Sequence, residues 1–259
     1  MMIALAMLLA AAPPTAVEVR RLPADDARQG VASGDGALFA IDNRAIARID
    51  PVSGKVAARW QGDEAHFKHL NSCIVHGRAL ICAGSNYPDL PMASRIETFD
   101  ARTLEHRSTR EMGPGYGSLT WVDWHAGGWW ACYANYDGKG GAPGRDHRAT
   151  TLVRYDKAFR ETGRWIFPDA VLDRFAPRSS SGGVWGGDGL LYVTGHDRPE
   201  LYALRVPEGG GVLELVATIA IPTDGQAIGW DEHAPRLLWG IERKTHELVA
   251  SRLPVVASP

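Results

Sequence analysis

The chain repeats one pattern of short strands and turns five times. In each segment a small or amide residue opens a short apolar strand, and a glycine-containing turn leads to a second strand. A polar loop then leads to a third strand and often a fourth. A single four-stranded sheet cannot bury both of its faces, whereas radial stacking of such sheets does so. The sequence therefore predicts an all-β fold, a five-bladed β-propeller. The segments span residues 28–60, 69–112, 117–167, 180–221 and 225–254.

The two ends of the repeat indicate how the ring closes. The fifth segment supplies only three strands, and an alternating stretch, AVEVRRLP at 16–23, precedes the first segment without a partner. We predict that this stretch is the outermost strand of blade five, which removes an exposed sheet edge. Residues 17–259 are then one propeller domain. A β-sandwich with insertions would leave the repeat unexplained. The stretch PDAVLDRFAP at 168–177 is expected to form one short helix before blade four.

The net charge and the N-terminal sequence indicate which partners and which cellular location to expect. The 28 basic and 30 acidic residues give a net charge of −2, which offers no bulk attraction to nucleic acid or to an anionic membrane. We expect a monomer with a small-molecule ligand as its partner. Residues 1–16, MMIALAMLLAAAPPTA, resemble a signal peptide, which predicts a periplasmic or secreted protein. The alternative is a disordered leader. No other stretch approaches transmembrane length.

Two of the three cysteines flank a predicted hairpin turn. A two-residue turn at Gly77-Arg78 places Cys73 opposite Cys82 in a non-hydrogen-bonded pair, where side chains come closest. This register predicts a disulfide, which suits an exported protein. The alternative is two small buried strand residues. Cys132 is expected to be a buried thiol.

Polar residues gather on one face of the predicted ring. Loops from second to third strands, and loops between blades, emerge at the same mouth of the central channel, and a rigid scaffold commonly carries its functional residues on such loops. We predict His69, His196 and Tyr136 as catalytic candidates. The candidate ligand-binding residues are Gln29, Arg44, Asn71, Asn86, Tyr87, Asn135, Arg148, Arg178, Gln226 and Arg243.

Each candidate has a functional and a structural interpretation. A histidine such as His196 can move a proton near neutral pH, or it can bond a neighbouring blade's backbone. The Asn-Tyr pairs at 86–87 and 135–136 can bind a ligand or simply shape a repeated turn. The arginines can clamp a carboxylate or phosphate, or form surface ion pairs. The glycine-rich insertion at 138–148 leaves from the same rim and is expected to bring Arg148 over the mouth.

Metal binding is an alternative for the histidine-rich loop. His66 and His69 have H-x-x-H spacing, which occurs in metal sites, but no carboxylate has a fixed spacing to them. We predict no cofactor and assign no metal ligands. A divalent metal at the mouth is the alternative.

The blade motifs are similar to those of a known family. RQGVASGDGALFAIDNRAIARIDPVSGKV resembles the first blade of the five-bladed glutaminyl cyclotransferases of plants and bacteria, and GGDGLLYVTGHDRPELYALRV resembles another blade. Over roughly 27–254 the chain also resembles small exported propellers loosely labelled cycloisomerase-like. That family pattern implies a glutamate at the start of innermost strands. Here those positions carry Gln29, Asn71, Ser118, Ser181 and Gln226.

Three functions fit these features. The first is an enzyme of the lyase, cyclase or isomerase type, acting by histidine acid–base chemistry on an anionic or carbonyl-bearing metabolite. The second is a propeller that binds a ligand or a protein without catalysis. The third is a metal-dependent hydrolase similar to lactonases. Without the family's glutamates, glutamine cyclisation lacks its expected acid–base group.

Overall fold

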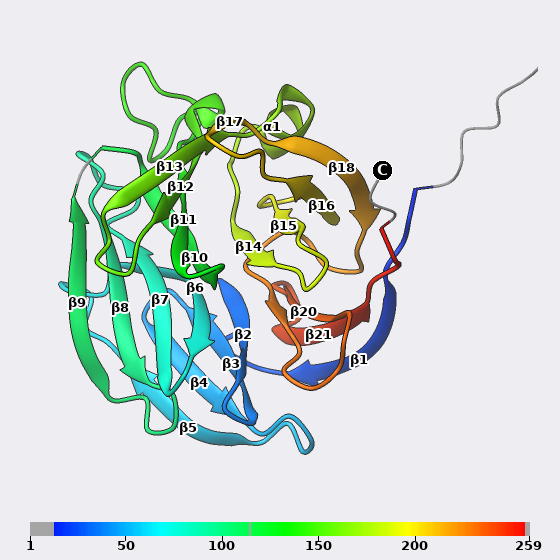
Figure 1. Cartoon of the computed structure of the whole chain (residues 1–259). Coiled ribbons are helices and arrows are strands. Elements are labelled where there is room, and N and C mark those ends of the chain that lie inside the picture. Colours follow the sequence, from blue (N-terminus) through cyan, green and yellow to red (C-terminus); the bar gives the residue numbers. More distant parts are fainter. Residues whose placement is uncertain (1–12, 114, 257–259) are drawn as a thin grey trace, which may run out of the picture.

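The computed structural model describes residues 13–113 and 115–256. Five sheets surround a central axis (Figure 1), which confirms the predicted five-bladed β-propeller. From the axis outward, blade one contains β2 (Gly30–Gly34), β3 (Ala37–Asp42), β4 (Ala45–Ile49) and β5 (Val56–Gln61), and blade two contains β6 (His69–His76), β7 (Ala79–Ser85), β8 (Ser94–Asp100) and β9 (His106–Gly113).

The remaining blades follow the same order with two additions. Blade three gains a fifth strand, β17, which pairs in parallel with β13 and comes from the β16–β18 connection of blade four. A short helix, α1 (Asp169–Phe175), precedes blade four as predicted. The strands are β10 (Ser118–His125), β11 (Gly128–Ala134), β12 (Thr151–Tyr155), β13 (Glu161–Ile166) and β17 (Gly211–Val212) in blade three, then β14 (Gly182–Trp185), β15 (Leu191–Thr194), β16 (Glu200–Arg205) and β18 (Glu214–Ala220) in blade four, and β19 (Gly229–Trp230), β20 (Leu237–Glu242), β21 (Glu247–Arg252) and β1 (Val17–Pro23) in blade five.

The apolar core lies between neighbouring blades. Strand residues alternate between the two faces of a sheet, so each blade presents one apolar row to each neighbour. Between blades one and two, Phe39 and Ile46 share a buried cluster with Leu80 and Phe99. These side chains are fully or almost fully buried, so the interfaces between blades fix the position of each strand end at the channel mouth.

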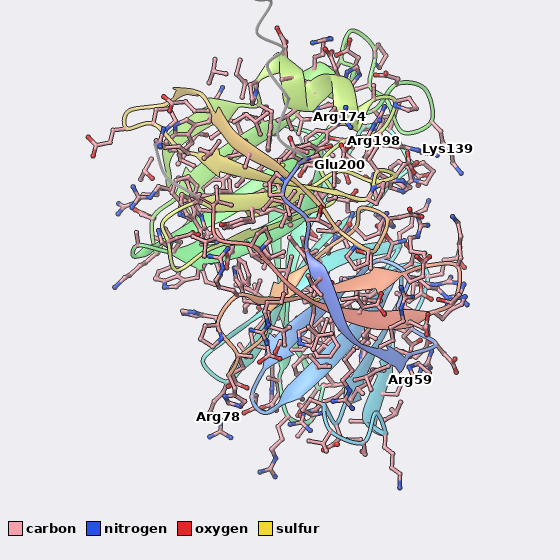
Figure 2. The ribbon with its side chains drawn as sticks, turned by 90° about the vertical axis from the view of Figure 1, so that its right-hand side faces the viewer. Arg59, Arg78, Lys139, Arg174, Arg198 and Glu200 are labelled. Carbon is pink, nitrogen blue, oxygen red and sulfur yellow. A yellow bond between two sulfur atoms is a disulfide. The ribbon has the colours of Figure 1, made fainter. Side chains whose placement is uncertain are left out.

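The N-terminal segment closes the ring, as predicted. β1 pairs antiparallel with β21 along its whole length. Just before it, the N–H of Ala16 donates to the carbonyl of Ala220 at 2.8 Å, so the segment also bonds the outer strand of blade four. Figure 2 shows this segment running along the outside of the ring toward Arg59. Leu22 packs into the core between blades five and one.

The innermost strands approach each other closely around the axis. A Cβ on Gly30 would lie 2.4 Å from the Cβ of Ala227 in the neighbouring blade. Two atoms cannot come this close, so glycine at this position lets blades five and one meet at the axis.

The predicted disulfide between Cys73 and Cys82 is confirmed. The hairpin has the expected register, with His76 opposite Ala79 and Cys73 opposite Cys82. Cys132 is a buried free thiol, and burial raises its pKa to about 12. A protonated thiol is a poor nucleophile, so Cys132 serves the core.

Two predictions concern the N-terminus and membranes. The predicted signal peptide spans 1–16, and its residues 1–12 lie outside the described part of the chain. Among the described residues, no helix is long and apolar enough to cross a membrane.

Removal of the closing strand tests the ring. A chain that begins at Ala24 lacks β1, so the edge of β21 is exposed and the core contact of Leu22 is lost. We expect this chain to melt well below the full chain and to form oligomers in size-exclusion chromatography. A chain that begins at Pro13 is the control. Equal melting temperatures for the two truncated chains would contradict the role of β1.

Candidate functional site

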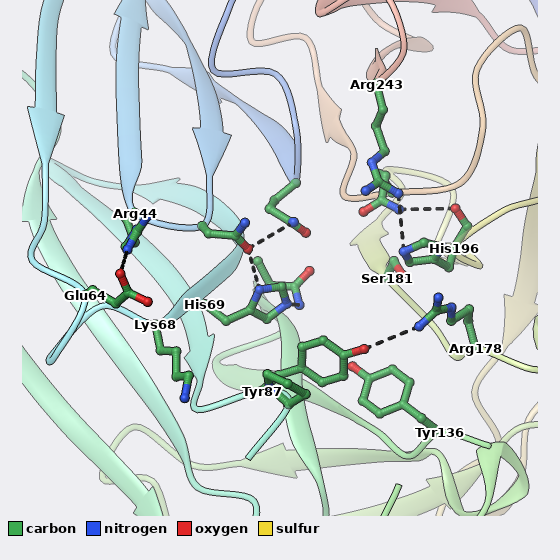
Figure 3. Close-up of a pocket in the computed structure, with 15 residues that line it drawn as sticks. Arg44, Glu64, Lys68, His69, Tyr87, Tyr136, Arg178, Ser181, His196 and Arg243 are labelled. Carbon is green, nitrogen blue, oxygen red and sulfur yellow. Dashed lines mark hydrogen bonds and ion pairs between the residues drawn. The ribbon is translucent and has the colours of Figure 1, made fainter. Parts of the chain in front are cut away.

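One pocket occupies the mouth of the central channel. Its volume is about 470 Å³, which suits a small metabolite. Its walls come from the starts of the innermost strands and the ends of the second strands, and Figure 3 shows side chains from all five blades around it. The predicted residues that line it are His69, His196, Tyr136, Gln29, Arg44, Asn71, Tyr87, Arg178, Gln226 and Arg243.

The two asparagines of the Asn-Tyr pairs lie outside this pocket. The side chain of Asn86 bonds its own loop, donating to the carbonyl of Pro91 at 3.0 Å and accepting from the N–H of Ala93 at 2.7 Å. Asn135 is buried and donates to the carbonyl of Ala149 at 3.0 Å. Both amides stabilise the shape of their loops, which agrees with the structural interpretation of these residues. Neither lies in the pocket, where a ligand-binding role would place it.

Arg148 does not reach over the mouth either. Its guanidinium forms ion pairs with Asp169 and Asp173 on α1, which lies beside the insertion. The insertion instead packs behind the pocket wall. A Cβ on Gly140, whose φ is +78°, would lie 2.3 Å from the ring of Tyr87, so a glycine there lets the loop support that ring.

The H-x-x-H pair is split between two surroundings. Phe67, between the two histidines, is buried among Trp60 and Phe99. Its burial directs His66 toward the outer strands of blade two, while His69 begins β6 and lines the channel. The interpretation of His66 and His69 as a shared metal site is therefore wrong.

A chain of amide hydrogen bonds fixes His69. Its Nδ1 donates to the side-chain oxygen of Asn43 at 2.5 Å, and this oxygen also accepts from Gln29 at 3.1 Å. On the other side, Asn71 donates to His69 Nε2 at 3.1 Å. The imidazole therefore carries its proton on Nδ1 and presents a lone pair on Nε2. Burial lowers the pKa of His69 to about 4, and the charges of His196 and Arg243 add to this effect.

His196 has the same tautomer through different partners. Its Nδ1 donates to the carboxylate of Asp197 at 2.5 Å, and Arg243 donates to its Nε2 at 3.3 Å. Gln226 holds the loop by donating to the His196 carbonyl at 3.2 Å. Burial lowers the pKa of His196, against the opposing effect of Asp197. Two neutral imidazoles thus present their Nε2 atoms at the same mouth, and the charge of one lowers the pKa of the other.

Two tyrosines form an adjacent wall. Tyr87 and Tyr136 follow the second strands of consecutive blades, and their rings meet edge-on with centroids 5.0 Å apart. Tyr87 also packs against His69, at 5.2 Å between centroids. Burial raises the pKa of Tyr136, so its hydroxyl stays protonated and can donate a hydrogen bond but cannot act as a base.

The pocket carries an excess of positive charge. Its lining includes four cationic side chains and one carboxylate, that of Glu64. Among the described residues, Arg178 and Arg243 have no ion-pair partner; Arg178 bonds the hydroxyl of Tyr87 at 3.3 Å and Arg243 bonds His196. Sequence reasoning missed Glu64 and Lys68, although both lie in the stretch that also contains His66 and His69. Glu64 pairs with Arg44, and Lys68 with an aspartate of the next loop.

Clusters of metal-ligand type lie elsewhere. The described residues contain two groups whose histidine and carboxylate ligand atoms converge, and neither lines the channel pocket. These groups are His66, Glu97 and His106, and Asp137, Asp146 and His147. The arginines of the pocket favour an anion over a metal cation.

Comparisons with known proteins support the fold. No protein-family model matches the sequence, and a comparison with curated proteins finds no match either. Among solved structures, the chain is similar to a luciferin-regenerating enzyme (TM-score 0.54, 11% identity, 95% of this chain and 93% of that chain). It is also similar to the PQQ-bound aldose sugar dehydrogenase of Streptomyces coelicolor (TM-score 0.54, 12% identity, 95% of this chain and 84% of that chain).

A third similar structure is a gluconolactonase of Xanthomonas campestris (TM-score 0.52, 13% identity, 86% of this chain and 71% of that chain). These identities are low, so the similarities show the β-propeller fold alone. The class of protein is therefore a five-bladed β-propeller whose distant structural neighbours include enzymes.

The lowered pKa of His69 predicts a pH-dependent stability. Between pH 6.5 and about 4 the unfolded chain protonates this histidine and the native chain does not, so the free energy of unfolding falls as the pH drops. The contribution is on the order of 3 kcal/mol. We expect urea unfolding of His69→Asn to lose less stability between pH 7 and pH 4.5 than the wild type does. His233→Asn, at an exposed site, is the control; equal losses in all three proteins would contradict the lowered pKa.

Proposed function

We propose that the channel mouth is the active site of an enzyme that binds a small anionic metabolite and moves a proton on it by histidine acid–base chemistry. One observation carries this proposal: two guanidinium groups that have no ion-pair partner in the described part of the chain and two neutral imidazoles line the same pocket. A lyase, cyclase or isomerase acting on a carboxylate or carbonyl compound fits this set. The propeller enzymes among the structural neighbours are compatible with catalysis on this fold.

The arginines account for binding. Arg178 comes from the loop before β14 and Arg243 from the loop after β20, so they lie on different blades. Planar guanidinium groups bind carboxylates through charge-assisted hydrogen bonds. Burial is the main cause of the lowered pKa of both histidines, and the positive charge of Arg243 adds to it; a bound carboxylate would offset that charge.

The histidines account for proton transfer. In His196, the Asp197 carboxylate holds the Nδ1 proton and would stabilise the imidazolium that forms when Nε2 accepts a proton. Arg243 now bonds this Nε2, and a substrate anion that draws the guanidinium away would free the lone pair. His69, whose pKa is lowered by burial and by the charges of His196 and Arg243, would remain neutral. Asn71 now donates to its Nε2, so a substrate donor would bond this nitrogen by taking the place of Asn71.

The resemblance to glutaminyl cyclotransferases supports a related scaffold and a different chemistry. The start of each innermost strand carries an amide or serine in place of that family's glutamate, and Gln29, Asn71, Ser181 and Gln226 line the pocket. These groups can orient a polar ligand but cannot take up a proton at neutral pH. The confirmed disulfide is consistent with export to an oxidising compartment, which we propose as the location.

The arginine variants test anion binding. Binding of lactones, muconate-like diacids and glutaminyl peptides is first screened by thermal shift and calorimetry. For the compounds that bind, Arg178→Gln and Arg243→Gln should each weaken affinity about tenfold or more, because each removes a charged hydrogen bond. Arg148→Gln removes a nearby guanidinium that lies outside the pocket, and its affinity should match the wild type. Equal affinities in all four proteins would contradict the assignment.

The histidine variants separate an enzyme from a binding protein. The double variant His69→Asn/His196→Asn should keep its affinity within a fewfold and lose about 100-fold or more in kcat, because it lacks both the proton acceptor His196 and its neutral partner His69. His233→Asn should leave kcat unchanged. A wild type that binds members of the panel and converts none of them would favour the non-catalytic binding function.

A further inference from the structure

The loop between blades one and two meets the outer strands of blade two at a second polar cluster, on the side of this loop remote from the channel. His66 lies in the loop, Glu97 on β8, and His106 and Thr109 on β9. The ligand atoms of the two histidines and the carboxylate all lie within 4.8 Å of one another.

Both imidazoles direct Nε2 at the same carboxylate. His106 Nε2 lies 2.8 Å from one oxygen of Glu97, and His66 Nε2 lies 3.4 Å from the other. Thr109 donates its hydroxyl to the first oxygen at 2.6 Å, which fixes the orientation of the carboxylate. Ligating carboxylates in metal sites are commonly held by such a second hydrogen bond.

Glu97 is buried without a full set of hydrogen-bond partners for its carboxylate. Its side chain has no exposed surface, yet its Oε1 has no hydrogen-bond partner among the described residues. Arg95 approaches, but its Nε stays 4.0 Å from this oxygen, and its Nη1 donates to the carbonyl of His66 at 2.9 Å. A buried carboxylate with an unpaired oxygen is costly unless a cation completes its surroundings.

We propose that His66, Glu97 and His106 form a binding site for a divalent transition-metal ion, with Zn²⁺ as the expected occupant. Two imidazole nitrogens and one carboxylate oxygen are a known zinc ligand set, and nitrogen donors favour zinc over calcium or magnesium. The aromatic rings of Phe67 and Phe99 pack on His106, with centroids 5.2 and 5.1 Å from it, and form an apolar surrounding. The His66 side chain is 42% exposed, so an ion can enter and a water molecule can complete the coordination.

The ion would fasten the connecting loop to blade two. His66 is two residues from Lys68 and three from His69, both of which line the channel pocket. Without the ion, the loop is held there by weaker contacts such as the 3.1 Å bond between His66 Nε2 and Thr109. This site therefore stabilises the pocket wall from outside, and the proposal does not depend on which reaction the pocket performs.

Zinc titration of the untagged full-length protein tests the site. The protein is stripped with a chelator, and Zn²⁺ affinity is measured by competition with a chromophoric chelator, with elemental analysis for the stoichiometry. The wild type and His233→Asn should each bind one Zn²⁺ per chain and melt at a higher temperature with zinc. His66→Asn and His106→Asn should each lose at least about 100-fold in affinity, more than the 10–100-fold typical of residues that only support a ligand.

The variants also distinguish this site from the second group of ligand-type residues, which contains Asp146. His66 is partly exposed, so His66→Asn should fold even if a substitution of the buried Glu97 does not, and the test remains valid with this variant. Cobalt in place of zinc should give the visible absorption of a four-coordinate site in the wild type and not in His66→Asn. The proposal is overturned if the wild type binds no zinc, if both histidine variants retain wild-type affinity, or if Asp146→Asn, in the other ligand group, abolishes binding while His66→Asn does not.

Discussion

The pairing of β1 with β21 is the constraint on which the rest of the structure depends. Five blades can bury their faces only against one another, so each interface needs both neighbours in place, and the last interface exists only when the ring is closed. Closure brings the five innermost strands together at the axis, where Gly30 meets Ala227. The channel mouth is thus formed by residues far apart in the sequence and near one another in space.

The arrangement of polar groups at the mouth follows from this geometry. Loops at the ends of short, rigid strands can carry groups that the core could not tolerate. His69 and His196 are held on opposite sides of the pocket by amides, a carboxylate and an arginine, and each keeps its Nδ1 proton. Burial is the main cause of the lowered pKa of both histidines, and the charge of Arg243 adds to it. Both imidazoles are therefore neutral, which prepares the pocket for an anion and for transfer of one proton. The same loop that presents His69 inward carries His66 outward, so one short connection contributes to two polar sites.

The sequence predicted the fold well because its signals are local and repeated. Strand alternation, glycine turns and the unpaired segment at 16–23 were sufficient to infer the number of blades, the closing strand, the short helix and the register of the Cys73–Cys82 hairpin. Loop membership also predicted which residues reach the mouth, because the strand order determines that face. What the sequence could not predict was the direction of individual side chains in irregular loops.

The residues that were predicted to line the pocket but lie elsewhere show why side-chain directions could not be predicted. Asn86 turns back on its own loop, Asn135 satisfies buried carbonyl groups, and Arg148 pairs with aspartates on α1. Each of these partners becomes a neighbour only after folding. Likewise, the burial of Phe67 separates His66 from His69, and no spacing rule conveys that separation. The carboxylate beside His66 comes from β8, about thirty residues away, so the spacing of residues in the sequence does not indicate it.

The central claim is that the channel mouth holds neutral Nδ1–H histidines ready for an anionic ligand, and nitrogen NMR of the imidazoles measures this most directly. The account predicts that His69 and His196 are neutral, with the proton on Nδ1, at pH 7, and that saturation with a carboxylate ligand raises the pKa of at least one of them while His233 stays unchanged. A protonated His69 at neutral pH, or Nε2–H tautomers that respond to no carboxylate, would contradict it.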